Sequence, residues 1–248
     1  MKRILFSVAL SLLLFSTHAQ SLKIMSYNIK SGVGMDNVRN YDRSAQIIRK
    51  LKPDVVAVQE LDSVTRRSHG DYVLGELAKR TGMHAFYAPA IHYDGGKYGI
   101  GLLSKKIPIR EYYVSLPGRE EQRALFIAEF ERFIFCGTHL SLTEADRMAS
   151  IEKLKHTLGN LDKEKPVFLA GDFNSLPGSP FIQELQKDFI ILTDTASPTF
   201  PSPMPDRTID YIVLMKGGPK TIKVKQTKVV NEPLASDHRP VFVKVKLK

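Results

Sequence analysis

Charged and polar side chains suited to hydrolytic chemistry follow several apolar runs of this sequence. The run 55–58 leads through a glutamine into Glu60, and the run 167–170 leads into Asp172 and Asn174. Strands of one sheet deliver their end residues to a shared rim, so these groups are expected to meet. Charged groups are costly in an apolar setting unless they are paired or bind a metal ion. The complete candidate set is Asn28, Glu60, His139, Asp172, Asn174, Asp210, Asp237 and His238.

The types of these side chains indicate metal-assisted hydrolysis. Carboxylate and amide oxygens are hard ligands, which favour Mg²⁺, Mn²⁺ or Ca²⁺. Zinc sites prefer His and Cys, and the HExxH pattern of zinc hydrolases is absent from the sequence. The GxxxxGK[ST] loop of nucleotide-binding proteins and the GxSxG elbow of serine esterases are absent too. The sequence therefore argues against an HExxH zinc hydrolase, a P-loop nucleotide-binding protein and a GxSxG serine esterase.

Each candidate also has an explanation that involves no function. Asp172 and Asn174 could form a local turn, in which an Asp side chain bonds the backbone two residues on. His139 could be a buried histidine satisfied by its neighbours. Asn28 could form a hydrogen bond with the backbone at the end of a strand, and Glu60 could be a surface residue that follows a strand. A non-functional interpretation needs all of these explanations at once, so we favour a shared site.

Apolar strand-like runs alternate with amphipathic helical segments along the chain. The run 241–247 alternates valine and lysine, which is typical of a half-buried strand. Thr143 precedes a helical segment and is expected to cap it. Many strands with interspersed helices indicate an α/β or α+β sandwich. Strands are predicted at 24–29, 55–59, 98–104, 111–116, 124–130, 133–138, 167–170, 209–214, 221–229 and 241–247, and helices at 43–51, 72–81, 143–158 and 179–187.

Length and composition fit a globular protein. The chain has 248 residues, of which 25% are charged and 43% hydrophobic, and this balance excludes disordered and fibrous proteins. Residues 1–19 combine a basic start, an apolar stretch and a small-residue cleavage site, so we predict a signal peptide followed by a single domain over 20–248. Export to the periplasm, the cell surface or the medium is expected. Cys136 is the only cysteine, which excludes an intrachain disulfide, and it is expected to be buried.

An ordered set of short motifs resembles the endonuclease/exonuclease/phosphatase superfamily, the deoxyribonuclease I-like metal-dependent phosphoesterases. The motifs span nearly the whole chain after the predicted signal peptide and occur in the order of that family. The resemblance implies a four-layer sandwich, with two mostly antiparallel sheets packed face to face and helices outside. The matching pieces are Met25-Ser26-Tyr27-Asn28, Val58-Gln59-Glu60, Tyr98-Gly99-Ile100-Gly101-Leu102-Leu103-Ser104, Gly137-Thr138-His139-Leu140, Gly171-Asp172-Phe173-Asn174-Ser175, Ile209-Asp210-Tyr211-Ile212 and Ser236-Asp237-His238-Arg239-Pro240.

The resemblance also implies a metal site and a nucleophile. Asn28, Glu60 and Asp237 are the expected metal-side residues, with Mg²⁺ as the expected ion and Mn²⁺ or Ca²⁺ as alternatives. Asp172 would orient or deprotonate the attacking water. Asn174 would hold the phosphate or the nucleophile.

Two histidines receive roles by the same resemblance. Asp210 would orient His238, which would donate to a phosphoryl oxygen, and His139 would do the same from the other side or assist the leaving group. Repair endonucleases of the family tend to have an acidic residue where this chain has Lys30, so a second metal ligand is not expected there. The presence of His139 favours the deoxyribonuclease, sphingomyelinase and phosphatase branches over the repair branch.

The substrate is expected to be a phosphoester, and its class stays open. The formal net charge of +10 suits nucleic acid, although no compact Lys/Arg cluster interleaved with aromatics is present, and a phospholipid or sugar headgroup is the other possibility. Arg66, Tyr98 and Arg123 are expected near the site rim as substrate-binding residues. A sphingomyelinase-like lipid phosphodiesterase and a non-catalytic anion-binding module are the alternatives. No membrane span and no protein partner is predicted, and the number of metal ions, the general base and the oligomeric state stay open.

Overall fold

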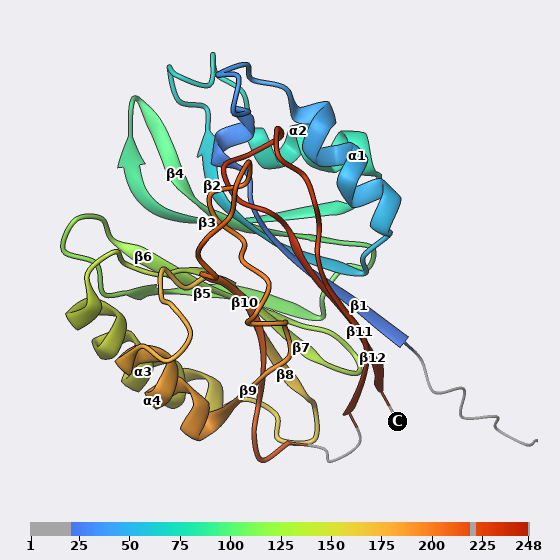
Figure 1. Ribbon diagram of the computed structural model, residues 1–248, viewed down its shortest axis with the longest axis vertical. Coiled ribbons are helices and arrows are strands. Elements are labelled where there is room, and N and C mark those ends of the chain that lie inside the picture. Colours follow the sequence, from blue (N-terminus) through green and yellow to red (C-terminus); the bar gives the residue numbers. More distant parts are fainter. Residues whose placement is uncertain (1–20, 219–221, 248) are drawn as a thin grey trace, which may run out of the picture.

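A computed structural model describes residues 21–218 and 222–247. The predicted signal peptide, residues 1–19, lies outside the described residues. Two six-stranded sheets face each other, and helices cover their outer sides (Figure 1). The predicted four-layer sandwich is therefore confirmed. In the described part of the chain no helix has the length and apolar character that a membrane crossing needs.

The first sheet has the strand order β11-β12-β1-β2-β4-β3. Strands β1 and β2 are parallel, and the crossover between them contains helix α1 (Tyr41–Leu51), whereas the other neighbours are antiparallel. Helix α2 (Val73–Thr81) follows β2. The strands are β1 (Ser21–Asn28), β2 (Val55–Ser63), β3 (His84–Tyr93), β4 (Gly96–Ser104), β11 (Ile222–Val229) and β12 (Val241–Leu247).

The second sheet has the strand order β5-β6-β7-β8-β10-β9. Its single parallel pair is β7 and β8, connected through helix α3 (Glu144–Gly159). Helix α4 (Pro180–Asp188) follows β8, and a short 3₁₀ helix, η1 (Lys30–Gly32), follows β1. The strands are β5 (Arg110–Leu116), β6 (Arg123–Glu129), β7 (Ile134–His139), β8 (Val167–Asp172), β9 (Phe189–Ile191) and β10 (Asp210–Met215).

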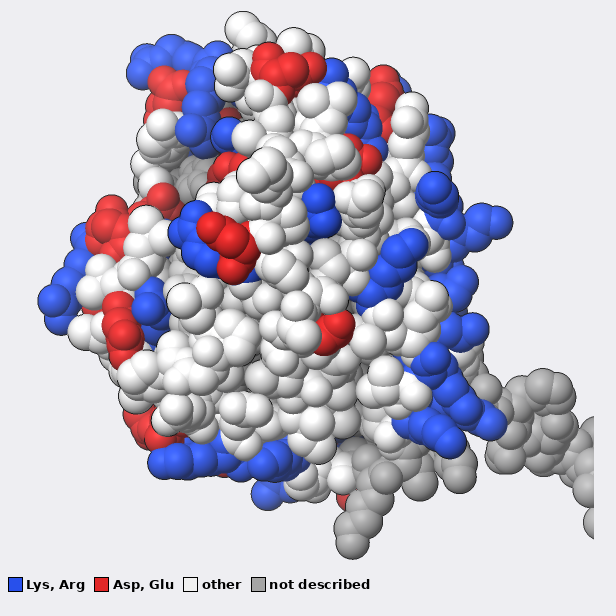
Figure 2. Space-filling view, viewed as in Figure 1, with Lys and Arg blue, Asp and Glu red and all other residues white. Residues whose placement is uncertain are grey.

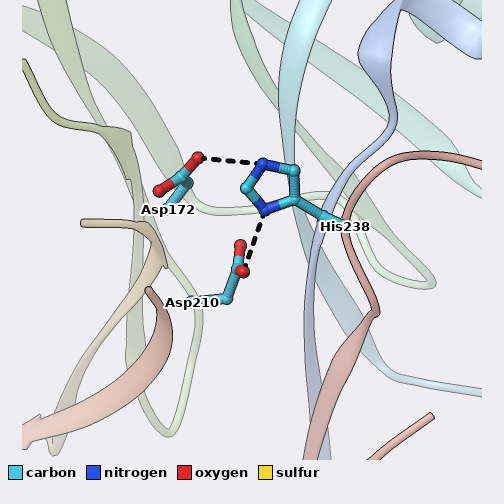
Figure 3. A group of neighbouring side chains, drawn as sticks. All are labelled: Asp172, Asp210 and His238. Atoms are coloured by element: carbon cyan, nitrogen blue, oxygen red, sulfur yellow. Dashed lines mark hydrogen bonds and ion pairs between the residues drawn. The ribbon is translucent and has the colours of Figure 1, made fainter. Parts of the chain in front are cut away.

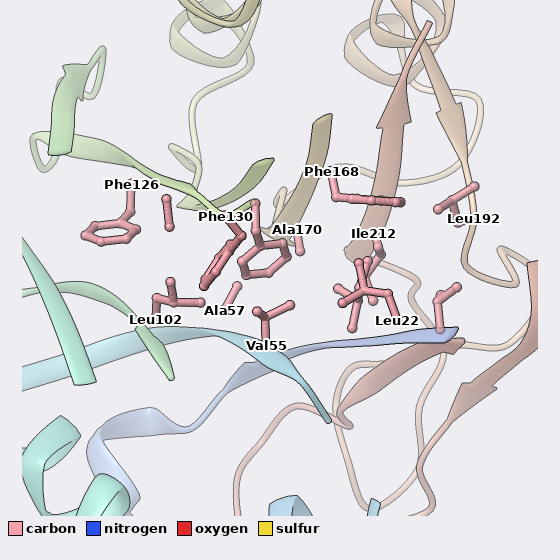
Figure 4. Packing of buried hydrophobic residues seen from close by; sticks show 14 of the residues in the cluster. Leu22, Val55, Ala57, Leu102, Phe126, Phe130, Phe168, Ala170, Leu192 and Ile212 are labelled. Carbon is pink, nitrogen blue, oxygen red and sulfur yellow. The ribbon is translucent and has the colours of Figure 1, made fainter. Parts of the chain in front are cut away.

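Three hydrophobic clusters separate the four layers. The cluster between the sheets contains Val55, Ala57 and Phe168, which interdigitate across the sandwich (Figure 4). A second cluster joins α3 and α4 to the second sheet, and a third joins α1 and α2 to the first sheet. Successive strand residues point to opposite faces, so alternate positions of β8 belong to different clusters. Cys136 is buried in the helix-side cluster of the second sheet, as predicted.

The inner faces of several strands change from apolar to polar at one end of the sandwich. In β8 the inner positions end on Asp172, in β7 on His139, and in β1 on Asn28. Asp172 pairs in register with His139 of β7 and with Asp210 of β10. Strand alternation and register therefore bring polar residues from distant segments to one rim of the inter-sheet core.

Three local expectations were incomplete or wrong. The short strand β9, which has three residues and pairs only with β10 among the described strands, was not predicted. Strand β3 was not predicted; it lies at the edge of its sheet, most of its residues are partly exposed, and it contains Pro89. Thr143 precedes α3 as expected, but its side chain makes no capping hydrogen bond to the helix. Its hydroxyl instead donates to Glu120 at 3.3 Å, so a tertiary contact replaces the local cap.

Candidate active site

Asp172 lies at the centre of the polar rim. Its Oδ2 accepts a hydrogen bond from Asn28 Nδ2 at 3.2 Å, and the same amide donates to Glu60 Oε1 at 2.8 Å. Asn28 comes from the first sheet and Asp172 from the second, and both side chains are buried. The backbone N–H of Lys30 donates to Asn28 Oδ1 at 3.1 Å. These bonds fix the orientation of the amide between the two carboxylates.

Glu60 reaches this rim through a break in strand alternation. The register between β2 and β4 shifts between Val58 and Leu61, and Glu60 has a φ of 57°. Val58 and Leu61 both pack in the cluster between the first sheet and helices α1 and α2. The bulge between them interrupts the alternation of the strand and directs the Glu60 side chain into the cleft. Burial raises the pKa of Glu60, although the hydrogen bond from Asn28 acts in the opposite direction. This carboxylate therefore lacks full compensation for its charge.

His238 and Asp210 form a buried pair. The distance between His238 Nδ1 and Asp210 Oδ2 is 2.9 Å, and His238 Nε2 lies 3.6 Å from Asp172 Oδ2 (Figure 3). Burial alone would lower the pKa of His238, but the charges of Asp210 and Asp172 outweigh it and raise the pKa to about 10. The ring also packs against Phe200, with centroids 4.8 Å apart. The imidazole is thus fixed in position and held in the cationic form.

His139 stands on the other side of Asp172 in the opposite charge state. Its Nε2 lies 3.5 Å from Asp172 Oδ2, and 7% of the residue is exposed. Burial lowers the pKa of His139 to about 4, because desolvation of the cation exceeds the attraction of Asp172. One carboxylate therefore has a neutral imidazole on one side and a cationic imidazole on the other.

Asn174 is held by the turn that follows β8. Its backbone N–H donates to Asp172 Oδ1 at 2.9 Å, and its Nδ2 donates to the Leu140 carbonyl at 2.9 Å. The turn considered as a non-functional explanation is therefore present. It uses one oxygen of Asp172, while the other oxygen faces Asn28 and the two histidines. The same turn that satisfies the local backbone also orients the central carboxylate.

The segment before β12 closes the rim. Ser236 Oγ donates to the Asn28 carbonyl at 2.8 Å, which ties this segment to the end of β1. Asp237 faces the cleft and forms an ion pair with Lys30, with Nζ and Oδ2 3.6 Å apart. A lysine ammonium thus occupies the neighbourhood where repair enzymes were expected to have an acidic residue.

Two sets of residues at this rim could hold a metal ion. Asp172, Asp210 and His238 offer ligand atoms that all lie within 4.8 Å of one another. In that set the Nδ1 of His238 already bonds Asp210, so a metal would compete with a buried hydrogen bond. Glu60 has a raised pKa, and together with Asn28 and Asp237 it offers hard oxygen ligands. The residues present therefore fit a divalent cation bound by oxygen atoms.

The rim opens into a cleft of about 400 Å³. Tyr98 and Arg123, two of the three predicted substrate residues, line it. Arg66 does not line it; its side chain is 82% exposed and pairs with Asp94, because the loop after β2 directs it outward. Sequence reasoning did not identify four further residues of the lining, which lie in loops and carry no motif. They are Glu121, Leu142, Phe200 and Arg207.

Comparison with known proteins identifies related sequences. The family model described as "Endonuclease/Exonuclease/phosphatase family" matches residues 25–238. "Protein angel" of Drosophila melanogaster is 26% identical over 198 residues, covering 66% of this chain and 55% of that protein. The chain thus corresponds to about half the length of this relative. "Uncharacterized protein YbhP" of Escherichia coli K12 is 27% identical over 179 residues, covering 64% of this chain and 68% of that protein.

Solved structures share the fold at lower identity. A functionally unknown conserved protein from Enterococcus faecalis superposes with a TM-score of 0.74 at 20% identity, covering 92% of this chain and 100% of that chain. Danio rerio TDP2 complexed with a single-strand DNA product gives 0.71 at 18%, covering 91% and 99%. A mannosyl-6-phosphatase of Bacteroides thetaiotaomicron gives 0.70 at 18%, covering 90% and 99%. These structures agree with the sandwich described above.

Proposed function

The chain belongs to the endonuclease/exonuclease/phosphatase family of phosphoester hydrolases, and we propose that it hydrolyses its substrate with a divalent metal ion held by Asn28, Glu60 and Asp237. The observation that carries the proposal is Asp172, a buried carboxylate between a neutral and a cationic imidazole. An anion-binding module would have no use for a carboxylate at the centre of its site. We therefore prefer a hydrolase to a binding module.

The metal ion would be Mg²⁺ or Mn²⁺, which, when bound, neutralises phosphoryl oxygens and lowers the pKa of water. Asn28 would hold Glu60 in place for it, through the 2.8 Å hydrogen bond to Oε1. Lys30 contributes a fixed positive charge beside Asp237. Burial of Glu60 supports this assignment, because a nearby cation removes the cost of its buried charge.

Proton transfer would use Asp172 and His238. Asp172 is an acceptor of the right kind to orient a water molecule and take its proton, and Asn174 would hold a phosphoryl oxygen or that water. His238 would donate through Nε2 to the phosphoryl group, because Nδ1 is engaged by Asp210. Asp210 would act as a positioning residue, which keeps the imidazole protonated and aligned. A neutral His139 would serve as a hydrogen-bond donor rather than as an acid.

Two similar folds belong to proteins with different phosphoester chemistry, namely TDP2 with a DNA product and a mannosyl-6-phosphatase. A similar fold at 18% identity does not indicate which of these two substrate classes this chain hydrolyses. The predicted signal peptide, residues 1–19, supports the further proposal that the enzyme acts after export.

Hydrolysis by the purified enzyme tests the proposal. We expect turnover of bis-p-nitrophenyl phosphate or p-nitrophenyl phosphate with Mg²⁺ or Mn²⁺, loss of turnover with a chelator, and recovery on adding metal. Asp172→Asn should lower kcat by about 10²–10⁴-fold. The matched control is Asp162→Asn, which changes a carboxylate on the loop after α3. Turnover that survives both the chelator and Asp172→Asn would refute the proposal.

A further inference from the structure

The cleft extends past the catalytic residues and has walls of its own. Tyr98, Glu121 and Arg123 line one part, and Phe200 and Arg207 line another. These residues come from β4, the start of β6 and the loops before β6 and β10. The volume of about 400 Å³ lies at the lower end of the range for small-molecule sites. The part of a substrate that is attached to the reacting phosphate would lie against these walls.

Glu120 and Glu121 are neighbours in sequence with different surroundings. Glu120 accepts hydrogen bonds from Ser141 Oγ at 2.6 Å and from the Leu142 N–H at 2.8 Å, so its carboxylate holds the loop after β7. Glu121 lines the cleft, and among the described residues it has one ion pair, with Arg123 at 3.1 Å. Burial raises the pKa of Glu121. Because Arg123 is its one ion-pair partner among the described residues, the Glu121 carboxylate retains acceptor positions at the cleft that it lines.

Arg123 is an unusual component of this wall because only 5% of it is exposed. Its guanidinium contacts Glu120 at 3.3 Å and Glu121 at 3.1 Å. Its Nε is buried and has no hydrogen-bond partner in the described part of the chain. A guanidinium has five N–H donors, and the contacts with Glu120 and Glu121 use only part of this capacity, so Arg123 retains donors at the cleft that it lines. The wall thus pairs an acceptor with a donor.

Tyr98 completes this wall and is held from behind. The guanidinium of Arg67 lies 5.4 Å from the Tyr98 ring centroid, and it makes two 2.8 Å hydrogen bonds to the buried carboxylate of Asp62. On the other wall Arg207 lies 4.6 Å from the ring centroid of Phe200. Aromatic faces that are fixed by charged neighbours can pack on the C–H faces of a ring or chain.

We infer that this cleft recognises a hydroxyl-rich, uncharged alcohol, so that the substrate is a phosphorylated sugar or polyol. The inference rests on the proposed hydrolase function and specifies its substrate class. An ionised Glu121 only accepts hydrogen bonds, and the hydroxyl groups of such an alcohol can supply the donors. Arg123 would donate to the same or a neighbouring hydroxyl oxygen. Tyr98 would pack against the carbon skeleton.

The charges of the cleft disfavour a polynucleotide. A second phosphate close to the reacting one would meet the Glu121 carboxylate at short range, where like charges repel. Arg207 has a carboxylate partner in Asp206, at 3.2 Å, so the cleft presents no run of unpaired cations. The surplus of lysines lies elsewhere, over the edge strand β11 and its neighbour β12, as Figure 2 shows at the right of the molecule. Proteins that bind single-stranded nucleic acid line a groove with cationic side chains along the path of the phosphate backbone, and the described lining of this cleft lacks such a row.

A substrate panel and one substitution test the inference. Initial rates with Mg²⁺ are measured on hexose phosphates, glycerol phosphate, p-nitrophenyl phosphate, bis-p-nitrophenyl phosphate, nucleotides and single-strand DNA. We expect the highest kcat/KM on a sugar or polyol phosphate. Glu121→Gln should lower the ratio of kcat/KM for that substrate to kcat/KM for p-nitrophenyl phosphate by about tenfold or more, mainly through KM. Glu152→Gln on α3 is the matched control, and its side chain is 80% exposed.

The outcomes separate this inference from the proposed function. Chelator-sensitive turnover with DNA as the best substrate, or a ratio in Glu121→Gln within twofold of the unsubstituted enzyme, overturns the inference and leaves the hydrolase intact. No metal-dependent turnover on any substrate, including both nitrophenyl esters, overturns the proposed function and the inference with it. Urea unfolding of Glu121→Gln verifies that the variant is folded, and the panel on the unsubstituted enzyme does not depend on any variant.

Discussion

Asp210→Asn isolates the effect of one buried charge on His238. The substitution preserves size and removes the carboxylate that lies 2.9 Å from Nδ1. Asp210 and Asp172 together raise the pKa of His238 from an ordinary 6.5 to about 10 against the opposing effect of burial. This shift corresponds to about 5 kcal/mol of preference for the imidazolium in the folded protein. An opposite charge at this range accounts for about 1–3 pKa units, so we expect the pKa to fall by about 2 units.

The direction of the stability change follows from the same shift. A folded pKa above the unfolded one stabilises the protein below pH 6.5, and this contribution is lost as the pH rises toward 10. Asp210→Asn should therefore lower the free energy of unfolding by about 3 kcal/mol at pH 6, and by much less near pH 10. Urea unfolding at the two pH values measures the difference. Asp162→Asn is the control, since its carboxylate does not contact a histidine in the described residues.

A direct titration decides whether this reasoning is correct. The chemical shift of the His238 ring protons, followed by NMR in metal-free protein, reports the pKa without any substrate. Turnover provides the second readout. If a protonated His238 assists the reaction, the alkaline limb of the kcat–pH profile should move down by about 2 pH units together with the pKa. An unchanged His238 pKa in Asp210→Asn would refute the electrostatic account. A lowered pKa with an unshifted alkaline limb of kcat would instead remove His238 from the mechanism as a proton donor.

Three further predictions concern the surroundings of the site. Burial lowers the pKa of His139 to about 4, so on acidification the unfolded chain binds a proton before the folded one does. The free energy of unfolding should therefore fall by up to about 3 kcal/mol as the pH drops from 6.5 to 4. His139→Gln should reduce this fall when unfolding by urea is measured across the pH range, and an unchanged fall would contradict the prediction. Burial alone would raise the pKa of Glu120, but hydrogen bonds led by that from Ser141 lower it to about 2. Because Glu120 is exposed, solvent screens these interactions, and Glu120→Gln should cost about 1 kcal/mol at pH 7 in urea unfolding, a difference that shrinks as the pH falls from about 4.5 to 2. Gly171→Ala would place a Cβ 2.0 Å from the Thr138 carbonyl oxygen and should lower the Tm by several degrees, whereas Gly159→Ala, where a Cβ meets no atom within 4 Å, should not.

The strands that carry the site could be predicted because their inner faces are strongly apolar. In β8 the residues before Asp172 alternate between two buried faces, and the run 167–170 marks a strand from sequence alone. Strand β3 could not be predicted in this way, because it is a partly exposed edge strand with a proline and a register shift after Pro89. Its stability comes from pairing with β4, which is a long-range property that local patterns do not contain.

The residues of the candidate site likewise differ in whether the sequence could predict them, according to whether they end a strand or lie in a loop. Residues in strand-end motifs, such as Asn28 and Asp172, could be predicted because each motif fixes a position at the end of a strand. Glu121 and Arg207 could not, because they lie in loops whose neighbours come from distant segments. Arg66 was wrongly placed at the cleft, since a cation near a motif in sequence says nothing about where its loop directs it. Sequence thus predicts the reacting centre better than the walls that select the substrate.

The opposite charge states of the two histidines follow from what each contacts. Both are buried beside Asp172, and burial alone would make both neutral. His238 has a second carboxylate, Asp210, on its other nitrogen, whereas His139 has Arg123 among the charges that disfavour its cation. Both rings are buried at this end of the inter-sheet core, and each such neighbour is decisive because charges interact more strongly in a low-dielectric surrounding than in water. The burial that raises the pKa of Glu60 therefore also leaves His139 neutral, whereas the carboxylate of Asp210 keeps His238 an acid beside the same Asp172.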